Sequence, residues 1–164
     1  MNLIREQSAT LLAVAHVAAL VAWMGAWLAS HVVLFREGRC DGPSVRLDLR
    51  RRAQRLFLAE HVALAALLAT GLALMALRGW GLGRARWLGL KVGLAVFLVV
   101  PLEAMHAYVC HVWIARGLRQ TPAPPLAKGL VRGAGMEEMI RTLAIPLLGL
   151  SVPLLVWLSV AKPF

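Results

Sequence analysis

Apolar residues gather into four long runs along the chain, and the segments between them are rich in arginine, glycine or proline. At about 1.5 Å per residue, each run can cross the roughly 30 Å hydrocarbon core of a bilayer. The apolar residues do not recur at the period of an amphipathic soluble helix. We therefore predict an all-α integral membrane protein whose single transmembrane domain, residues 1–164, is a four-helix bundle. The predicted helices cover about residues 8–35, 56–77, 87–115 and 141–160.

Composition agrees with this prediction, since the 164 residues are 60% hydrophobic and have a mean hydropathy of +0.71. In a soluble protein the net charge of +10 would suggest a nucleic-acid partner. Here the arginines lie between the apolar runs, where they mark the cytoplasmic side of a membrane, and nothing resembles a nucleic-acid module. We expect a multi-pass protein of the cell inner membrane that contacts the lipid bilayer and no nucleic acid. The sequence leaves open whether the protein forms a homo-oligomer or belongs to a larger complex.

Lysine and arginine are divided unevenly between the two ends of the predicted helices. The first and third connections, with their helix ends, hold twelve, whereas the two termini and the second connection hold five. Both termini are therefore predicted to face away from the cytoplasm. Within the first connection, residues 45–52 fit either a basic surface helix or a solvated loop, and we favour the loop. Residues 121–135 are rich in proline and glycine and are also predicted to form a loop.

A few ionisable side chains interrupt the apolar runs, and each is a candidate for function because an ionisable group is costly at membrane depth. The segment 101–111 opens with Pro101, which we expect to bend its helix. It also carries a carboxylate, two imidazoles and a thiol, on Glu103, His106, His111 and Cys110. Glu60, His61 and His31 are predicted to lie in the same, cytoplasmic half of the membrane. His16 and Lys91 are predicted to lie in the opposite half.

Three interpretations of the cytoplasmic group remain open. Its residues could serve helix contacts in a structural subunit, or imidazoles from two helices could hold a haem iron. The haem candidates in this group are His31, His61 and His106. A non-haem metal ion is the third interpretation, because Glu-x-x-His spacing projects both side chains from one helical face. Since a second Glu-x-x-His is absent, we expect such a centre to be mononuclear or irregular. Its candidate ligands are Glu60, His61, Glu103, His106 and His111.

Two short motifs carry a resemblance to a known family. Residues 12–25 read LAVAHVAALVAWMG, with His16 and Trp23 seven positions apart, and residues 87–92 read WLGLKV, with Lys91 at the fifth position. Together with the arginine-rich entry to the second helix, this pattern resembles the HemJ-type protoporphyrinogen oxidases and, more loosely, the CopD-like small membrane proteins. The resemblance implies a haem b protein that oxidises a porphyrinogen or passes electrons within the membrane. It also implies that His16 is an axial ligand and Lys91 a functional group.

The chain departs from that family at Gly89, where a histidine is common, and at Ala59–His61, where a Thr-Pro-Gly stretch is usual. The interpretation of this chain as a relative of that family with altered chemistry therefore stays open. We expect a haem b oxidoreductase or electron carrier, working with a membrane redox partner or quinone. Lys91 and Glu103 are its candidate catalytic residues. The alternative is a non-haem metal-binding or metal-handling membrane protein.

Overall fold

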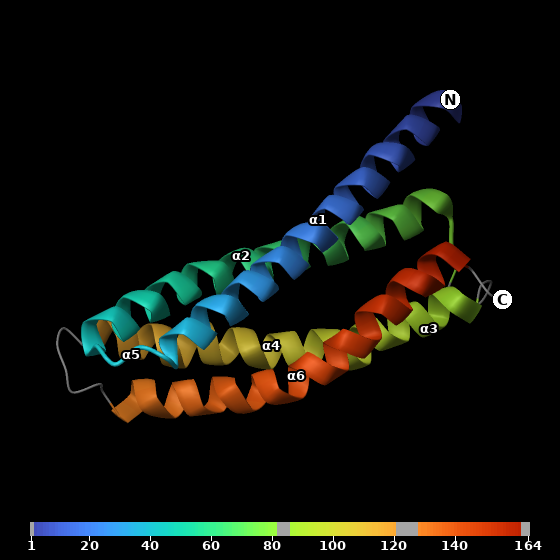
Figure 1. Ribbon diagram of the computed structural model, residues 1–164. Coiled ribbons are helices and arrows are strands. Elements are labelled where there is room, and N and C mark those ends of the chain that lie inside the picture. Colours follow the sequence, from blue (N-terminus) through green and yellow to red (C-terminus); the bar gives the residue numbers. More distant parts are fainter. Residues whose placement is uncertain (1, 82–85, 121–127, 162–164) are drawn as a thin grey trace. The chain divides into compact units, whose positions relative to one another are not determined.

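The computed structural model describes residues 2–81, 86–120 and 128–161, and all of its regular structure there is helical (Figure 1). The helices are α1 (Asn2–Glu37), α2 (Pro43–Arg78), α3 (Arg86–Leu94), η1 (Ala95–Val99), α4 (Val100–Tyr108), η2 (Val109–Ile114), α5 (Ala115–Gln120) and α6 (Lys128–Ala161). The segments α3 to α5 follow one another as a single span, in which η1 and η2 are π-helical. Among these described residues, four spans are long and apolar enough to cross a membrane, so the all-α prediction is confirmed.

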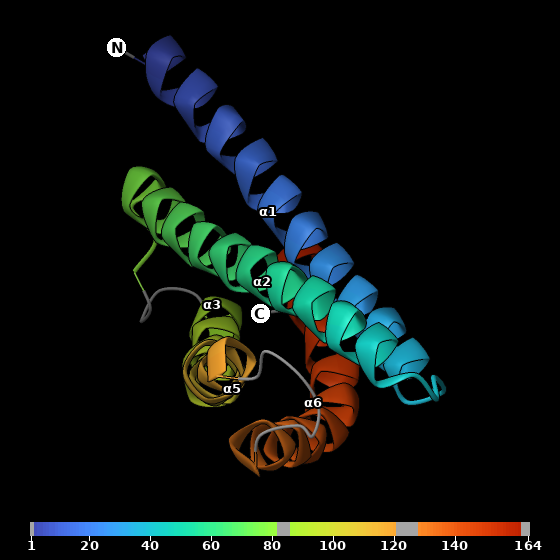
Figure 2. The same ribbon diagram turned by 90° about the vertical axis from the view of Figure 1, so that its left-hand side faces the viewer.

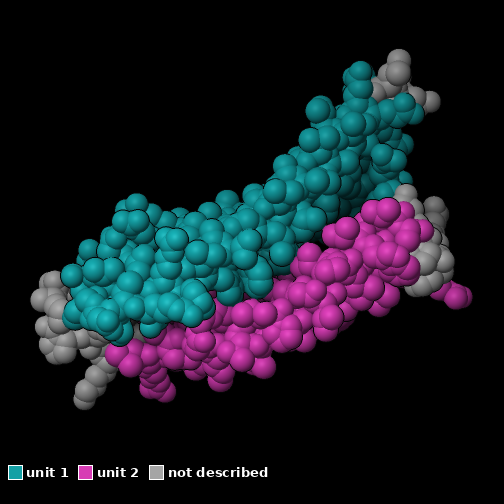
Figure 3. All heavy atoms as spheres, in the orientation of Figure 1, with its two compact units in different colours: residues 1–80 teal, residues 81–164 magenta. Residues whose placement is uncertain are grey.

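The chain divides into two compact units, residues 1–80 and 81–164 (Figure 3). Unit 1 contains α1 and α2, and unit 2 contains the interrupted span α3–α5 together with α6. Many large apolar side chains are exposed, among them Leu11, Val21 and Phe97. A soluble protein rarely exposes so many large apolar side chains, whereas a bilayer solvates them. These features describe a multi-pass membrane protein.

Unit 1 is an antiparallel pair of helices whose turn is set by local sequence. Gly42 precedes α2 and Pro43 occupies its first turn, where the missing N–H costs no hydrogen bond. At the other end Gly79 adopts φ 65°, and the N–H of Trp80 donates to the carbonyl of Met75 at 3.0 Å. Glycine adopts this left-handed conformation without a side-chain clash, so it closes the helix. The result is two 36-residue helices joined by a short turn.

Two contacts fix the register of α1 against α2. A salt bridge of 2.8 Å joins Arg50 to Glu37, and Nδ1 of His16 lies 3.0 Å from the hydroxyl of Thr70. The residue that faces position 61 across the pair is therefore about residue 25. At 1.5 Å per residue, His31 and His61 are offset by about 8–9 Å along the helix pair. His31 and His61 therefore do not lie at the same level, although the sequence analysis placed both in the cytoplasmic half of the membrane.

The helices are longer than predicted at the arginine-rich ends. Residues 45–52 belong to α2, so the loop interpretation is wrong and the helical alternative is correct in conformation. Arginine and leucine are strong helix formers, and the polar sequence continues the helix out of its apolar part. Residues 128–135 belong to α6, contrary to the predicted loop, and residues 121–127 lie outside the described part. A Cβ added to Gly133 would lie 3.1 Å from Ile114, so its small size allows close packing on η2.

Unit 2 contains the irregular helices. Pro101 lies in the first turn of α4, directly after the π-helical segment η1. Proline lacks an N–H, and its ring clashes with the carbonyl four residues earlier, so a wider turn at this point relieves that clash. The predicted distortion at Pro101 therefore takes the form of a π-helical turn. In α6, Pro146 and Pro153 lie inside the helix, and α6 changes direction along its length (Figures 1 and 2).

Candidate functional site

The first carboxylate and imidazole pair lies in the middle of α2. Glu60 is fully buried and His61 is half-buried, and donor atoms of the two side chains lie within 4.8 Å of each other. Nδ1 of His61 lies 2.5 Å from the carbonyl oxygen of Phe57, which can only accept a hydrogen bond. The proton of a neutral His61 therefore sits on Nδ1, and Nε2 presents a lone pair. Metal-bound histidines commonly have this arrangement, with the far N–H held by a carbonyl.

The second pair lies on α4 of unit 2. Glu103 is 3% exposed and His106 is half-buried, and their donor atoms also lie within 4.8 Å of each other. This geometry agrees with the prediction that Glu-x-x-His spacing directs both side chains from one face. The pair lies between η1 and η2, and π-helical turns occur frequently at functional sites. Cys110 and His111 belong to η2 and are not among the residues that offer donor atoms at this distance.

His31 has the same tautomer as His61. Its Nδ1 donates to the carbonyl of Trp27 at 2.7 Å, and its ring lies 4.3 Å from the Trp27 ring, centroid to centroid. The same carbonyl accepts a 2.7 Å hydrogen bond from the fully buried Ser30. These contacts fix the imidazole plane on α1 and leave Nε2 as the acceptor nitrogen.

The opposite end of unit 1 holds His16. The hydroxyl of Thr70 donates to the carbonyl of Ala66 at 2.7 Å, so it accepts the hydrogen bond from Nδ1 of His16. A Cβ added to Gly71 would lie 3.1 Å from Cε1 of His16, and this glycine therefore makes room for the ring. His16 is positioned by hydroxyl and glycine neighbours on α2, several turns from Glu60.

Lys91 has a partner within unit 2. Its Nζ donates to Oγ of Ser159 at 2.7 Å, and that hydroxyl donates to the carbonyl of Leu155 at 2.7 Å. The ammonium is therefore directed at α6 and holds a hydroxyl of that helix. His16 belongs to unit 1 and Lys91 to unit 2.

Two buried polar groups were not predicted as site residues. Nε1 of Trp23 and Oγ of Ser151 are buried and have no hydrogen-bond partner within the part of the chain that the structure describes. Thr70 and Ser159, which hold His16 and Lys91, were not predicted either. Thr70 and Ser159 share one signal in the sequence. Each is a hydroxyl residue inside an otherwise apolar membrane helix, where such groups form hydrogen bonds between helices.

Each pair offers one carboxylate and one imidazole. Carboxylates and imidazoles suit divalent metals such as Zn, Fe, Mn and Ni, whereas thiolates select softer ions. A carboxylate also offsets part of the double charge of such an ion, which lowers the cost of placing it in a medium of low dielectric constant. Each pair of donors therefore fits a divalent transition metal.

Comparison with known proteins adds no family to this description. No protein-family model, no curated protein and no solved structure matches the chain. The resemblance to HemJ-type and CopD-like proteins stays a prediction that depends on His16, Trp23 and Lys91.

Proposed function

We propose that the protein binds a divalent transition-metal ion within the membrane, and its candidate ligands are Glu60 and His61 in unit 1 and Glu103 and His106 in unit 2. The observation that carries this proposal is that each unit buries a carboxylate within 4.8 Å of an imidazole in an apolar helix. A buried carboxylate costs several kcal/mol unless it is protonated, paired or bound to a cation. A metal ion bound by such a pair compensates its carboxylate, and the function that we propose for the protein is metal handling in the membrane.

The tautomer of His61 supports the choice of a metal over a set of helix contacts. The carbonyl of Phe57 holds the Nδ1 proton, so the lone pair on Nε2 is oriented before a metal arrives. In unit 2, α4 is short and bounded by two π-helical turns, which fixes the rotation of Glu103 and His106 together. A site held on helices in this way keeps its donors in place better than a site on loops.

The test is metal stoichiometry in the purified protein. Cells are grown with added zinc, manganese or iron, and the metal per chain is measured by mass spectrometry of the digested protein. We expect metal to copurify with the parent. Glu60→Gln and Glu103→Gln, each nearly isosteric, should weaken binding at least about tenfold, while circular dichroism stays helical. His111→Gln should do much less, because His111 lies outside the described donor group.

The control is Glu138→Gln, which removes an exposed carboxylate that is ion-paired with Arg141 on α6. It should bind metal as the parent does. If one of Glu60→Gln and Glu103→Gln binds metal as the parent does, the carboxylate replaced in that variant is not a ligand. If Glu60→Gln, Glu103→Gln and Glu138→Gln all bind metal as the parent does, or if the parent holds no metal, the polar pairs serve helix contacts only.

A haem b protein of the inner membrane is the second candidate, and the histidine tautomers favour it. His16, His31 and His61 all carry the proton on Nδ1 and leave Nε2 to bind iron. The function would then be an oxidoreductase or electron carrier with a quinone or another membrane partner, and porphyrinogen oxidation with Lys91 is the activity that the resemblance implies. Absorption spectra with and without dithionite test it. Sharp bands of a six-coordinate b haem that are lost in His16→Gln support this candidate, and a colourless preparation from haem-replete cells contradicts it.

A further inference from the structure

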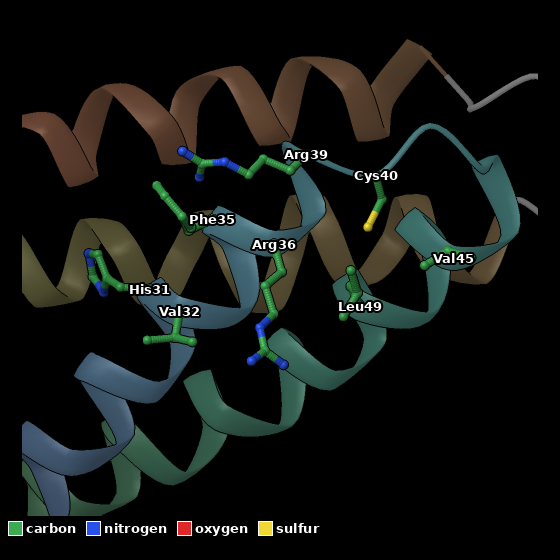
Figure 4. A pocket seen from close by; sticks show the side chains of 8 residues that line it. All are labelled: His31, Val32, Phe35, Arg36, Arg39, Cys40, Val45 and Leu49. Carbon is green, nitrogen blue, oxygen red and sulfur yellow. The ribbon is translucent and has the colours of Figure 1, made fainter.

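An open groove of about 810 Å³ lies at the end of unit 1 that carries the turn between α1 and α2 (Figure 4). Its walls include Val32 and Phe35 from α1 and Val45 and Leu49 from α2. Two arginines, Arg36 and Arg39, also line it. Figure 4 shows the Arg39 side chain lying across Phe35, while Arg36 extends on the side of Leu49. The groove is thus an apolar strip flanked by two cations.

The two cations differ from the neighbouring arginines in what compensates them. Arg50 pairs with Glu37, and Arg52 pairs with Asp48. Within the described residues, no hydrogen bond or ion pair involves the side chain of Arg36. The guanidinium of Arg39 instead stacks 3.4 Å above the centre of the Phe35 ring, which positions it without neutralising its charge. A positive charge therefore remains at the mouth of the apolar strip.

We propose that this groove binds one anionic phospholipid. The acyl chain lies along the strip of valine, leucine and phenylalanine side chains, and the phosphate meets the guanidiniums of Arg36 and Arg39. These arginines occupy the last turn of a membrane-spanning helix and the turn that follows it, which is the level of the lipid headgroups. A second copy of the chain fits less well, because it would bring like charges together at the same strip.

The experiment compares two lipids that differ only in the headgroup. Dioleoyl phosphatidylglycerol and dioleoyl phosphatidylcholine are titrated onto the detergent-solubilised protein, and the bound lipid is counted by native mass spectrometry. We expect at least about tenfold tighter binding of the anionic lipid. Arg36→Gln and Arg39→Gln should each weaken it about fivefold and leave the zwitterionic lipid little affected.

The matched control is Arg51→Gln, because Arg51 is an exposed arginine at the same end of unit 1 that does not line the groove. Its effect should be less than about twofold. Leu49→Asn, which makes one wall polar, should weaken both lipids. An equal effect of Arg51→Gln would overturn the proposal in favour of a diffuse surface charge. Equal competition by inorganic phosphate would show a free-anion site, and a dimer that excludes lipid would show that a second copy covers the groove.

Discussion

The two units contain helices of similar length but build them differently. In unit 1, α1 and α2 are continuous α-helices of 36 residues each, and the histidines on them bond to carbonyls or hydroxyls at a fixed register. In unit 2, the first span changes from α to π geometry twice, and α6 contains two prolines. Regular helix therefore surrounds Glu60, whereas irregular helix surrounds Glu103.

This difference shows two ways to hold a polar group in an apolar helix. His61 is held by a hydrogen bond to its own preceding turn, which needs no change in backbone geometry. Around Glu103, the backbone itself departs from α-helix on both sides, and π-helical turns rotate the residues that follow them. The first arrangement depends on side chains and the second on the exact number of residues in the span.

The largest effect is expected from deleting one residue in each unit. Deletion of Val21 from α1 should abolish folding, because it rotates the preceding part of the helix by about 100° and separates Ala19 from the face of Trp23. Deletion of Phe97, which is 83% exposed and lies in η1, should leave the protein folded but less stable, because it restores the clash between the Pro101 ring and the carbonyl four residues earlier. A π-helical turn holds one extra residue, and its loss leaves an α-helix with the same register on either side.

Folded yield and the thermal unfolding midpoint in detergent measure the two deletions. The protein lacking Phe97 should remain folded, while the protein lacking Val21 should not be recovered in monodisperse form. Because Val21 is also an exposed apolar residue, loss of lipid contact is matched between the two. Equal loss of folding in both would show that removing one residue from η1 does not preserve the helix register, and the contrast between the units would disappear.

A smaller effect is expected at Lys91. The double-mutant cycle of Lys91→Met and Ser159→Ala should give a coupling free energy of about 0.5–2 kcal/mol, since their hydrogen bond is charge-assisted and lies within a membrane span. Reversible unfolding in mixed micelles provides the free energies. The corresponding contact in unit 1 joins Arg5 to the carbonyl of Leu77 at an exposed end, so Arg5→Gln should cost less than about 1 kcal/mol. A coupling near zero would mean that Lys91 only reaches for the membrane surface.

The four membrane spans were predictable because apolar runs of this length have few other structures. The helix ends were not, because arginine-rich segments such as residues 45–52 satisfy a loop and a helix equally well in composition. Hydrophobicity predicts where lipid solvates the chain, and helix propensity then continues the structure beyond it. The π-helical turns were also not predicted, although Pro101 indicated where the distortion begins.

For the candidate site, the sequence identified the ionisable residues but not what orients them. The spacing of Glu103 and His106 predicted one shared face, and the distance between their donor atoms agrees with it. The partners of His16 and Lys91 could not be derived, because a contact between residues far apart in the chain depends on helix register. Nor could the tautomer of His61, which depends on the direction of a single carbonyl.

The smallest expected effect tests how closely α2 is fitted around His16. Alanine in a helix interior is normally about 0.5–1 kcal/mol more favourable than glycine, and Gly25→Ala should show this gain because no described atom beyond its own helical turn lies within 4 Å of the new Cβ. Gly71→Ala should gain less or lose stability, because its Cβ would lie 3.1 Å from Cε1 of His16 and push the ring from Thr70. Thermal unfolding midpoints compare the two variants. In a Thr70→Val background the hydrogen bond is already absent, so Gly71→Ala should recover part of the stability that alanine normally adds to a helix. If Gly71→Ala equals Gly25→Ala in the parent, the imidazole moves freely and its position is not set by α2.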